Sequence, residues 1–240
     1  DVYKRQGIDH LMAHKLVNEL KESELMNAET EVSFLSYCGG VPKVPNEFKY
    51  KFSWSPLGVL KALKSPSTSI KDFENFEVSR PWDAITSYTA PLNNPEEFEV
   101  YPNRDSIPFI EQYIFDRNWK IKQFVRGTLR LKGWAQAWAS IFNEIETLNG
   151  QAGEKRLIEM SEQFWRDNAY AENEPDRVIL CVDLKAEEDN HVIWHKTYKM
   201  DAWGDTRGTA MARLVSHPVS FAVKAIMDDE TDHGVIAASN

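Results

Sequence analysis

The sequence has very little cysteine, no long apolar run and no glycine-rich nucleotide fingerprint. Its 240 residues include two cysteines, Cys38 and Cys181, which are too few for a disulfide framework. Both are expected to stay thiols, as in the reducing cytoplasm. No stretch approaches the roughly 20 apolar residues of a membrane helix, and no secretory signal is recognisable. The composition therefore predicts a cytoplasmic protein that is neither disulfide-stapled nor embedded in a membrane.

Positive charge is scarce as well. Lys and Arg number 28 against 37 Asp and Glu, a formal net charge of −9, which argues against a nucleic-acid-binding surface. The sequence contains no Gly-x-Gly-x-x-Gly, the fingerprint of a dinucleotide-binding turn. The length and the hydrophobic content of 42% suffice for one large domain or two small ones with a real core.

The most informative stretch is 36–55, SYCGGVPKVPNEFKYKFSWS. It begins as the end of an alternating strand, 32–38, and is predicted to break at the double glycine 39–40. Two prolines then keep the chain irregular until Tyr50. Because glycine has no Cβ, the backbone can approach a small ligand at such a break. Taken alone, the pattern is more typical of a structural turn with a packed tryptophan.

Hydrophobic periodicity predicts an α+β fold with a mixed sheet of five or six strands. Helical spacing is found in the segments 8–21, 56–64, 134–148, 154–167 and 209–227, the last bent at Pro218. Alternation predicts strands near 32–38, 98–100, 124–131, 177–184 and 192–198, of which the last two form a hairpin. Segment 65–94 is predicted to be mostly loop with one short strand.

The strand predicted at 124–131 carries Arg126, Thr128 and Arg130 on one face and apolar residues on the other. A solvated sheet face explains this pattern as well as a binding site does.

Histidines do not indicate a metal site. His10 and His14 lie one helical turn apart, but Leu11 stands where the zinc-protease helix has glutamate. A capping or solvated pair is the better interpretation. Exposure on a strand accounts for His191 and His195.

Four short motifs follow the order and near spacing of one enzyme family. They are SYCGG at 36–40, YKFSWSPLGVL at 50–60, YPNRDS at 101–106 and VRGTLR at 125–130. Together with GIDH at 7–10, they make nearly all of the chain after Gln6 resemble saccharopine dehydrogenase of the glutamate-forming type, also called saccharopine reductase. Each motif is modest alone, but the ordered set is specific.

This resemblance implies reversible hydride transfer between NADP(H) and the imine that links glutamate to 2-aminoadipate semialdehyde, a step of lysine metabolism. The positions that match the family's substrate site are Cys38, Asn103, Arg104, Thr128 and Leu129. Arg130, at a strand end, and the backbone of Gly40 are further substrate-binding candidates from the residue pattern. Arginine suits the three carboxylates of saccharopine because a planar guanidinium forms paired hydrogen bonds.

Other roles follow from the same resemblance. Cys38 is expected to position substrate or relay a proton, since hydride transfer needs no nucleophile. Trp54 and Ser55 are expected to touch the nicotinamide end of NADP. Saccharopine and glutamate are the expected small-molecule partners, with a homodimer as a further expectation and no nucleic acid or membrane partner.

The family's dinucleotide domain precedes GIDH, so this chain is expected to be a piece that lacks it and is inactive alone. Residues 1–6, DVYKRQ, are expected to be a non-native leader. Segments 7–133 and 176–205 are expected to form a mixed-sheet domain for substrate binding and dimerisation, with 134–175 as a helical insert. Segment 206–240 is expected to be a C-terminal helix and tail that pack on the absent domain.

Two alternatives stay open. A related dehydrogenase could carry out a reductive condensation of a polyamine precursor, although such an amine would prefer carboxylates to arginines. The chain could also be a non-enzymatic binding domain, which the missing nucleotide fingerprint favours.

Overall fold

The computed structural model describes residues 7–231, and the predicted leader at 1–6 lies outside them. Eight strands form one mixed sheet in the described part of the chain. They are β1 (Glu31–Pro42), β2 (Ser67–Lys71), β3 (Glu74–Val78), β4 (Thr86–Ala90), β5 (Glu96–Pro102), β6 (Lys120–Leu131), β7 (Asp176–Glu188) and β8 (His191–Trp203). The main path runs β3-β2-β6-β1-β7-β8, while β5 pairs with β4 and β6. The structure confirms the predicted α+β class, with more strands than the five or six expected.

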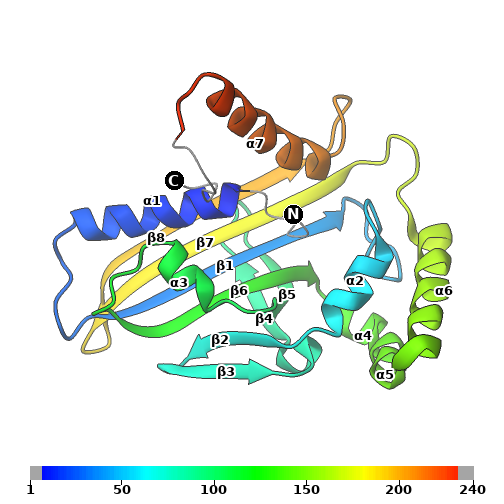
Figure 1. The fold of residues 1–240 in the computed structure, drawn as a ribbon, viewed down its shortest axis with the longest axis horizontal. Coiled ribbons are helices and arrows are strands. Elements are labelled where there is room, and N and C mark those ends of the chain that lie inside the picture. Colours follow the sequence, from blue (N-terminus) through cyan, green and yellow to red (C-terminus); the bar gives the residue numbers. More distant parts are fainter. Residues whose placement is uncertain (1–6, 232–240) are drawn as a thin grey trace.

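Long strands occupy the centre of the sheet. β1 and β6 pair in parallel, and the other pairs are antiparallel. β1, the second half of β6 and the first half of β7 are buried almost throughout, because both faces of the sheet are covered. Figure 1 shows these strands crossing the molecule diagonally, with helices above them and at one end.

Seven helices and one 3-10 turn accompany the sheet within residues 7–231. They are α1 (Ile8–Glu22), α2 (Pro56–Leu63), η1 (Pro81–Ala84), α3 (Pro108–Gln112), α4 (Trp134–Ala137), α5 (Ala139–Thr147), α6 (Gly150–Asn168) and α7 (Ala210–Met227). None of them combines the length and apolarity that a membrane crossing requires.

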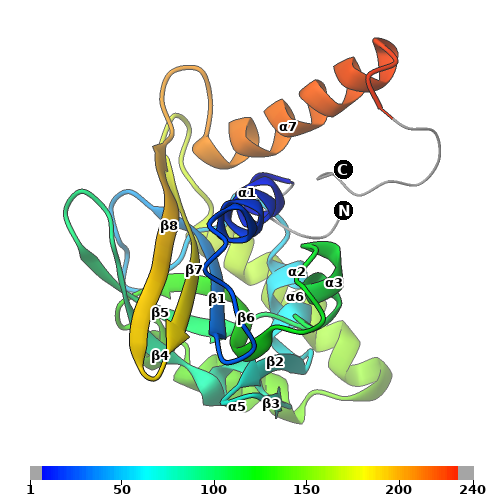
Figure 2. The ribbon, with the colours of Figure 1, turned by 90° about the vertical axis from the view of Figure 1, so that its left-hand side faces the viewer.

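One face of the sheet is covered by two separate hydrophobic clusters. The first is built by α1 and α3 on β1, β6 and β7, and the second packs α2, α4, α5 and α6 around Trp134 and Trp138. In Figure 2, α1 lies along the sheet and α7 projects above it. The reverse face carries a third cluster, where β4 and β5 lie against β1, β6 and β7. The rings of Tyr37 and Tyr88 pack edge to face there, with their centres 4.9 Å apart.

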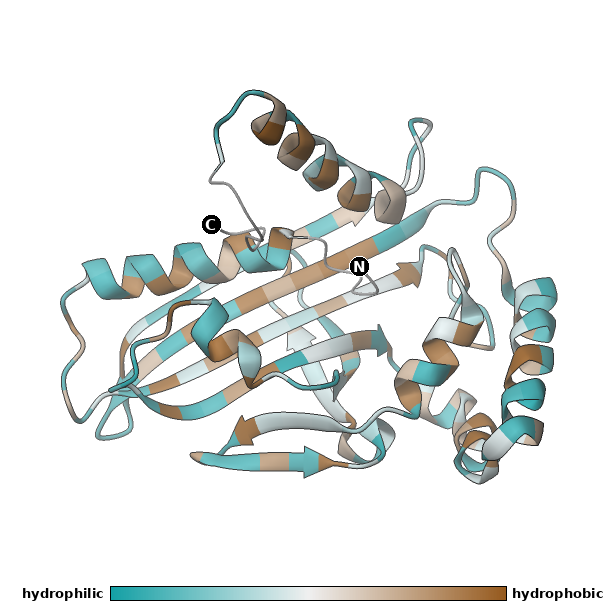
Figure 3. Ribbon diagram, in the orientation of Figure 1, coloured by the Kyte–Doolittle hydropathy of each residue, from teal (hydrophilic) through white to brown (hydrophobic). Residues whose placement is uncertain are grey.

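The apolar side of α7 is largely exposed. Phe221 is 72% exposed and Met227 is 80% exposed, and the brown bands along α7 in Figure 3 mark such residues. Thr209 caps the helix by accepting a hydrogen bond from the backbone N–H of Ala212, and the helix continues through Pro218. That α7 packs on a nucleotide-binding domain stays a prediction, as do the proposed domain boundaries.

Three local predictions were wrong. β1 does not break at its double glycine but continues to Pro42, paired with β7 throughout. Segment 65–94 contains β2, β3, η1 and β4; β3 and β4 are mostly exposed, so they show no apolar alternation. The helix expected over 134–148 is divided at Trp138, whose indole N–H donates to the carbonyl of Phe48 at 2.9 Å.

Candidate functional site

Three of the innermost strands bring a row of side chains together on the helix-covered face. In the β1–β6 ladder Cys38 lies opposite Thr128, and in the β5–β6 ladder Thr128 lies opposite Tyr101. Residues directly opposite one another in a ladder project from the same face. Cys38 and Thr128 are 9% and 8% exposed. The row formed by Cys38, Thr128 and Tyr101, called the Cys38 row below, is therefore buried between the two hydrophobic clusters.

A fork in the sheet lies beside this row. β2 pairs with β6 at Gln123 and Phe124, whereas β5 pairs with β6 from Gly127 to Leu131. β1 takes the other edge of β6 from Lys120 to Thr128, which includes the stretch paired with β2 and the start of the stretch paired with β5. β2 and β5 therefore share one edge of β6 and diverge between residues 124 and 127.

The YPNRDS segment closes this fork. The backbone N–H of Asn103 donates to the carbonyl of Arg126 at 2.8 Å, and the N–H of Thr68 donates to the carbonyl of Arg104 at 2.9 Å. The N–H of Arg126 donates in turn to the hydroxyl of Ser106 at 3.0 Å. Hydrogen bonds on both sides thus hold Asn103 and Arg104, both half-buried, beside the Cys38 row.

Arg104 adopts a left-handed backbone with φ of 55°. This region is uncommon for a residue with a Cβ and costs about 1–3 kcal/mol where the surrounding structure enforces it. Such conformations concentrate at functional sites.

Arg130 is a fully buried cation inside an aromatic cage. Its guanidinium carbon lies 4.7 Å from the ring centre of Tyr50, 5.2 Å from that of Trp134 and 5.4 Å from that of Tyr101. One Nη donates to the Tyr101 hydroxyl at 2.9 Å and the other to the carbonyl of Leu129 at 3.1 Å. Burial raises the pKa of the Tyr101 phenol, so the hydroxyl that accepts from Arg130 stays neutral.

No carboxylate within residues 7–231 pairs with Arg130. The side chain is 2% exposed, and its Nε has no acceptor among the described residues. Burying a charge without a partner is costly, and aromatic rings compensate for only part of that cost. The cage therefore holds a buried positive charge that no carboxylate within residues 7–231 neutralises.

Arg126, on the same face of β6, has a different environment. It is 5% exposed at the side chain and pairs at 3.2 Å with Asp9, which is fully buried at the start of α1. Its guanidinium also stacks 3.6 Å above the ring centre of Phe109. This pair anchors α1 to the sheet beside the site. Both residues lie inside the quoted motifs, but no sequence signal shows which acid meets which arginine.

The double glycine serves close packing. A Cβ on Gly39 would lie 2.5 Å from the carbonyl oxygen of Leu129, and one on Gly40 would lie 2.4 Å from the terminal methyl of Met211 in α7. This packing does not test whether the backbone of Gly40 contacts a ligand, so that contact stays a prediction. Leu129 points its side chain into the reverse-face cluster, so only its backbone is available to the candidate site.

Trp54 and Ser55 have evident structural roles. The Ser55 hydroxyl caps α2 by accepting from the N–H of Gly58 at 3.2 Å. The Trp54 indole N–H donates to the hydroxyl of Tyr50 at 3.3 Å, which links Trp54 to the cage of Arg130. Their contact with a cofactor stays a prediction.

The α1 histidines pack against aromatic rings. His14 is 7% exposed and meets Tyr113 edge to face at 5.7 Å, so the expectation of a solvated pair was wrong for it. Burial lowers the pKa of His14. His10 stacks on Phe109 at 5.6 Å. No cluster of three or more potential metal ligands occurs within residues 7–231.

Comparison with known proteins adds independent information. Residues 6–240 match a family described as the saccharopine dehydrogenase C-terminal domain. The chain is 38% identical to saccharopine dehydrogenase (NADP(+), L-glutamate-forming) of Pyricularia oryzae, over 98% of this chain and 66% of the relative. It is 36% identical to the mitochondrial alpha-aminoadipic semialdehyde synthase of Mus musculus, over 94% of this chain and 31% of the relative.

A solved structure has a similar fold. The apo histidine-tagged saccharopine dehydrogenase (L-Glu forming) from Saccharomyces cerevisiae superposes with a TM-score of 0.73 at 24% identity, over 97% of this chain and 66% of that one. The chain thus spans about two thirds or less of the length of these relatives.

Proposed function

Because the chain belongs to the family of saccharopine dehydrogenase C-terminal domains, we propose that it carries the substrate site of an oxidoreductase acting on the CH–NH bond of saccharopine. The reaction is hydride transfer between NADP(H) and the imine that joins glutamate to 2-aminoadipate semialdehyde. The names of the relatives with the larger coverage support both the substrate and NADP.

One observation carries this proposal: no carboxylate within residues 7–231 pairs with the buried Arg130, which lies next to Thr128 and Tyr101. A chain with net charge −9 would repel a tricarboxylate unless positive charge is concentrated in the site. Arg130 supplies a buried cation, and the half-buried Arg104 supplies another positive charge from the loop that closes the fork. Guanidinium groups bind carboxylates in a fixed orientation, so two of them would fix the position of the substrate.

The remaining site residues fit roles in orienting the substrate. The Thr128 hydroxyl and the Asn103 amide offer neutral hydrogen bonds at the rim of the Cys38 row. Cys38 would position the substrate or relay a proton. Cys181, whose pKa burial raises to about 11, points to the reverse face and takes no part.

NADP is the proposed cofactor, and the residues of this chain would contact only a small part of the NADP molecule. The sequence has no glycine-rich fingerprint, and Trp54 and Ser55 are already engaged in capping α2 and bracing Tyr50. We assign the main cofactor contacts to a dinucleotide domain outside this sequence. When bound, NADP supplies the hydride, while the residues of this chain hold and orient the substrate.

Calorimetric titration of saccharopine tests the proposal directly. Arg104→Ala should weaken binding by about 2–5 kcal/mol, the usual effect of truncating one partner of a buried charged contact. Arg117→Ala is the matched control, because Arg117 is 93% exposed and lies outside the site. In a protein that includes the dinucleotide domain, Arg104→Ala should raise KM for saccharopine. Equal affinities in both variants would refute the assignment of the site.

The alternatives give different outcomes. A polyamine-type substrate would be repelled by Arg104 and Arg130, so binding of a polyamine in place of saccharopine would favour the related condensation reaction. Saccharopine binding without any NADP-dependent turnover in the extended protein would favour a non-enzymatic binding domain. A homodimer and a cytoplasmic location are proposed in addition, and light scattering on the purified chain tests the former.

A further inference from the structure

The fork in the sheet creates a cavity on the face opposite the candidate substrate site. Where β2 and β5 diverge from the shared edge of β6, the side chain of Val125 has no strand beside it on that edge. The cavity has a volume of about 330 Å³ and is lined by residues of β1 to β6 and of the η1 region. Small-molecule pockets in proteins have volumes of roughly 300–1,000 Å³.

Its floor is apolar and buried. Tyr37, Val100 and Val125 line it and are 8%, 4% and 8% exposed. Gly127 allows this packing, because a Cβ there would lie 2.7 Å from the ring of Tyr37 and 2.9 Å from a methyl of Val100. Phe76 and Ile85 extend the apolar wall. The floor therefore suits a hydrocarbon body rather than a sugar or a phosphate.

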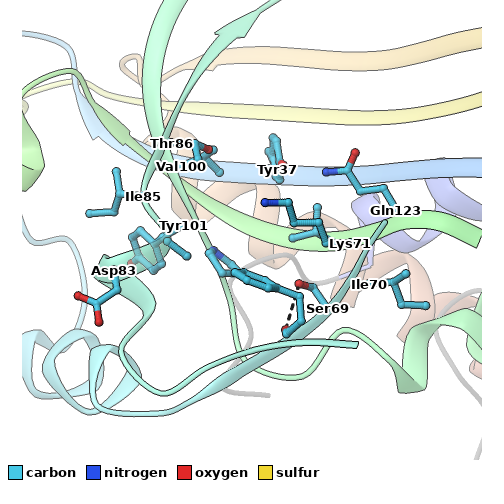
Figure 4. A pocket seen from close by; sticks show the side chains of 14 residues that line it. Tyr37, Ser69, Ile70, Lys71, Asp83, Ile85, Thr86, Val100, Tyr101 and Gln123 are labelled. Atoms are coloured by element: carbon cyan, nitrogen blue, oxygen red, sulfur yellow. Dashed lines mark hydrogen bonds between the residues drawn. The ribbon is translucent and has the colours of Figure 1, made fainter. Parts of the chain in front are cut away.

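Two hydrogen-bond donors lie together at one end. Lys71 and Gln123 are direct partners in the β2–β6 ladder, so their side chains project side by side from the cavity face, as Figure 4 shows. The Lys71 ammonium lies 5.3 Å from the ring centre of Phe76. Within residues 7–231 no carboxylate forms an ion pair with it. An ammonium next to a carboxamide N–H₂ is suited to a carboxylate.

The other end carries the opposite charge. Asp83 lies across the cavity from Lys71 and Gln123 in Figure 4. Its carboxylate accepts from Nε of Arg80 at 2.6 Å, and Arg80 also pairs with Glu146 at 2.5 Å. One cation with two anions leaves a net negative charge there. A ligand with a carboxylate at both ends would be repelled, which distinguishes this cavity from a site for a tricarboxylate.

We propose that this cavity binds a small monocarboxylate with an apolar body, whose carboxylate meets Lys71 and Gln123 and whose hydrocarbon part covers Val100 and Val125. The site lies on the other face of the sheet from the proposed substrate site and does not depend on it, although Tyr101 contributes to both. The two are nevertheless adjacent, since the β5 residues that line the cavity lead directly into Asn103 and Arg104. An occupant would pack against the strand that delivers the Arg104 loop.

Three probes of similar length test this proposal on the 240-residue chain: hexanoate, adipate and hexylamine. Titration calorimetry should show hexanoate binding with a Kd of about 1 mM, as expected for about eight non-hydrogen atoms. Adipate, with its second carboxylate near Asp83, and hexylamine, with the wrong charge, should bind at least about tenfold more weakly.

Matched lysine variants locate the site. Lys71→Gln should weaken hexanoate binding by about tenfold, the loss of one charge-assisted hydrogen bond. Lys155→Gln, at an exposed lysine of α6 away from the cavity, should leave it unchanged. Both residues are exposed, so both variants should fold, which circular dichroism checks. Absence of hexanoate binding, equal binding of hexylamine, or binding that Lys71→Gln leaves intact would each overturn the proposal.

Discussion

Replacing Arg130 with methionine tests whether the caged cation serves ligand binding or the fold. Methionine keeps the length and the flexible apolar stem of arginine and removes the charge. The variant loses the hydrogen bonds from Arg130 to the Tyr101 hydroxyl and the Leu129 carbonyl. It also loses cation–π contacts with three rings.

The expected change in stability is small because two large effects oppose each other. Hydrogen bonds from a charged donor contribute about 1.5–3 kcal/mol each, and cation–π contacts up to about 2 kcal/mol when desolvated. Against these stands the cost of burying an uncompensated cation, several kcal/mol. We expect the free energy of unfolding of Arg130→Met to lie within about 2 kcal/mol of the wild-type value.

Arg126→Met is the matched control on the same face of β6. Arg126 is buried to a similar degree but is paired with Asp9. Its removal leaves a buried carboxylate without this guanidinium, which should cost about 3–5 kcal/mol. Two arginine-to-methionine changes four residues apart should therefore differ clearly in urea denaturation followed by tryptophan fluorescence.

The same assay with saccharopine separates function from stability. A ligand present at about 100 times its Kd raises the free energy of unfolding by about 2.7 kcal/mol. The wild-type chain should show this rise and Arg130→Met should not. The reasoning fails if Arg130→Met destabilises the chain as much as Arg126→Met does and still responds to saccharopine.

Two further predictions concern packing and pH. Gly39→Ala should lower the free energy of unfolding by about 1–3 kcal/mol in urea denaturation, because the new Cβ would meet the carbonyl of Leu129 at 2.5 Å; a neutral result would contradict the close packing of β1 on β6. The lowered pKa of His14, caused by burial, means that the unfolded chain takes up a proton more readily. Stability from this residue is thus present above its unfolded pKa of 6.5 and declines as pH falls through the lower folded pKa. Urea curves at neutral and mildly acidic pH should show a smaller decline in His14→Gln, and an equal decline would point to other groups.

Local patterns predicted the long, periodic elements well. Apolar spacing located α1, and the alternation in 177–184 and 192–198 located the β7–β8 hairpin. These elements bury one regular stripe or face, so the pattern and the structure agree. β3 and β4 were missed because exposed edge strands have no apolar stripe to detect.

Residue type alone predicted which side chains could bind an anion but not which one is available. Arg126 and Arg130 occupy equivalent places in the alternation of β6, and the sequence offers no reason to separate them. Their difference comes from α1, which brings Asp9 to one of them, and from the aromatic segments that enclose the other. Both contacts join residues far apart in the chain.

The sequence by itself determined the family, the α+β class and the polar face of β6, because ordered motifs and period-two alternation are local properties. Only the tertiary structure decided that β1 continues through its double glycine and that β2 and β5 fork from one edge of β6. It also decided that Arg130 meets no carboxylate in the described part of the chain. These depend on pairing between distant segments, and the free energy of a buried charge is set by the groups that such pairing places around it.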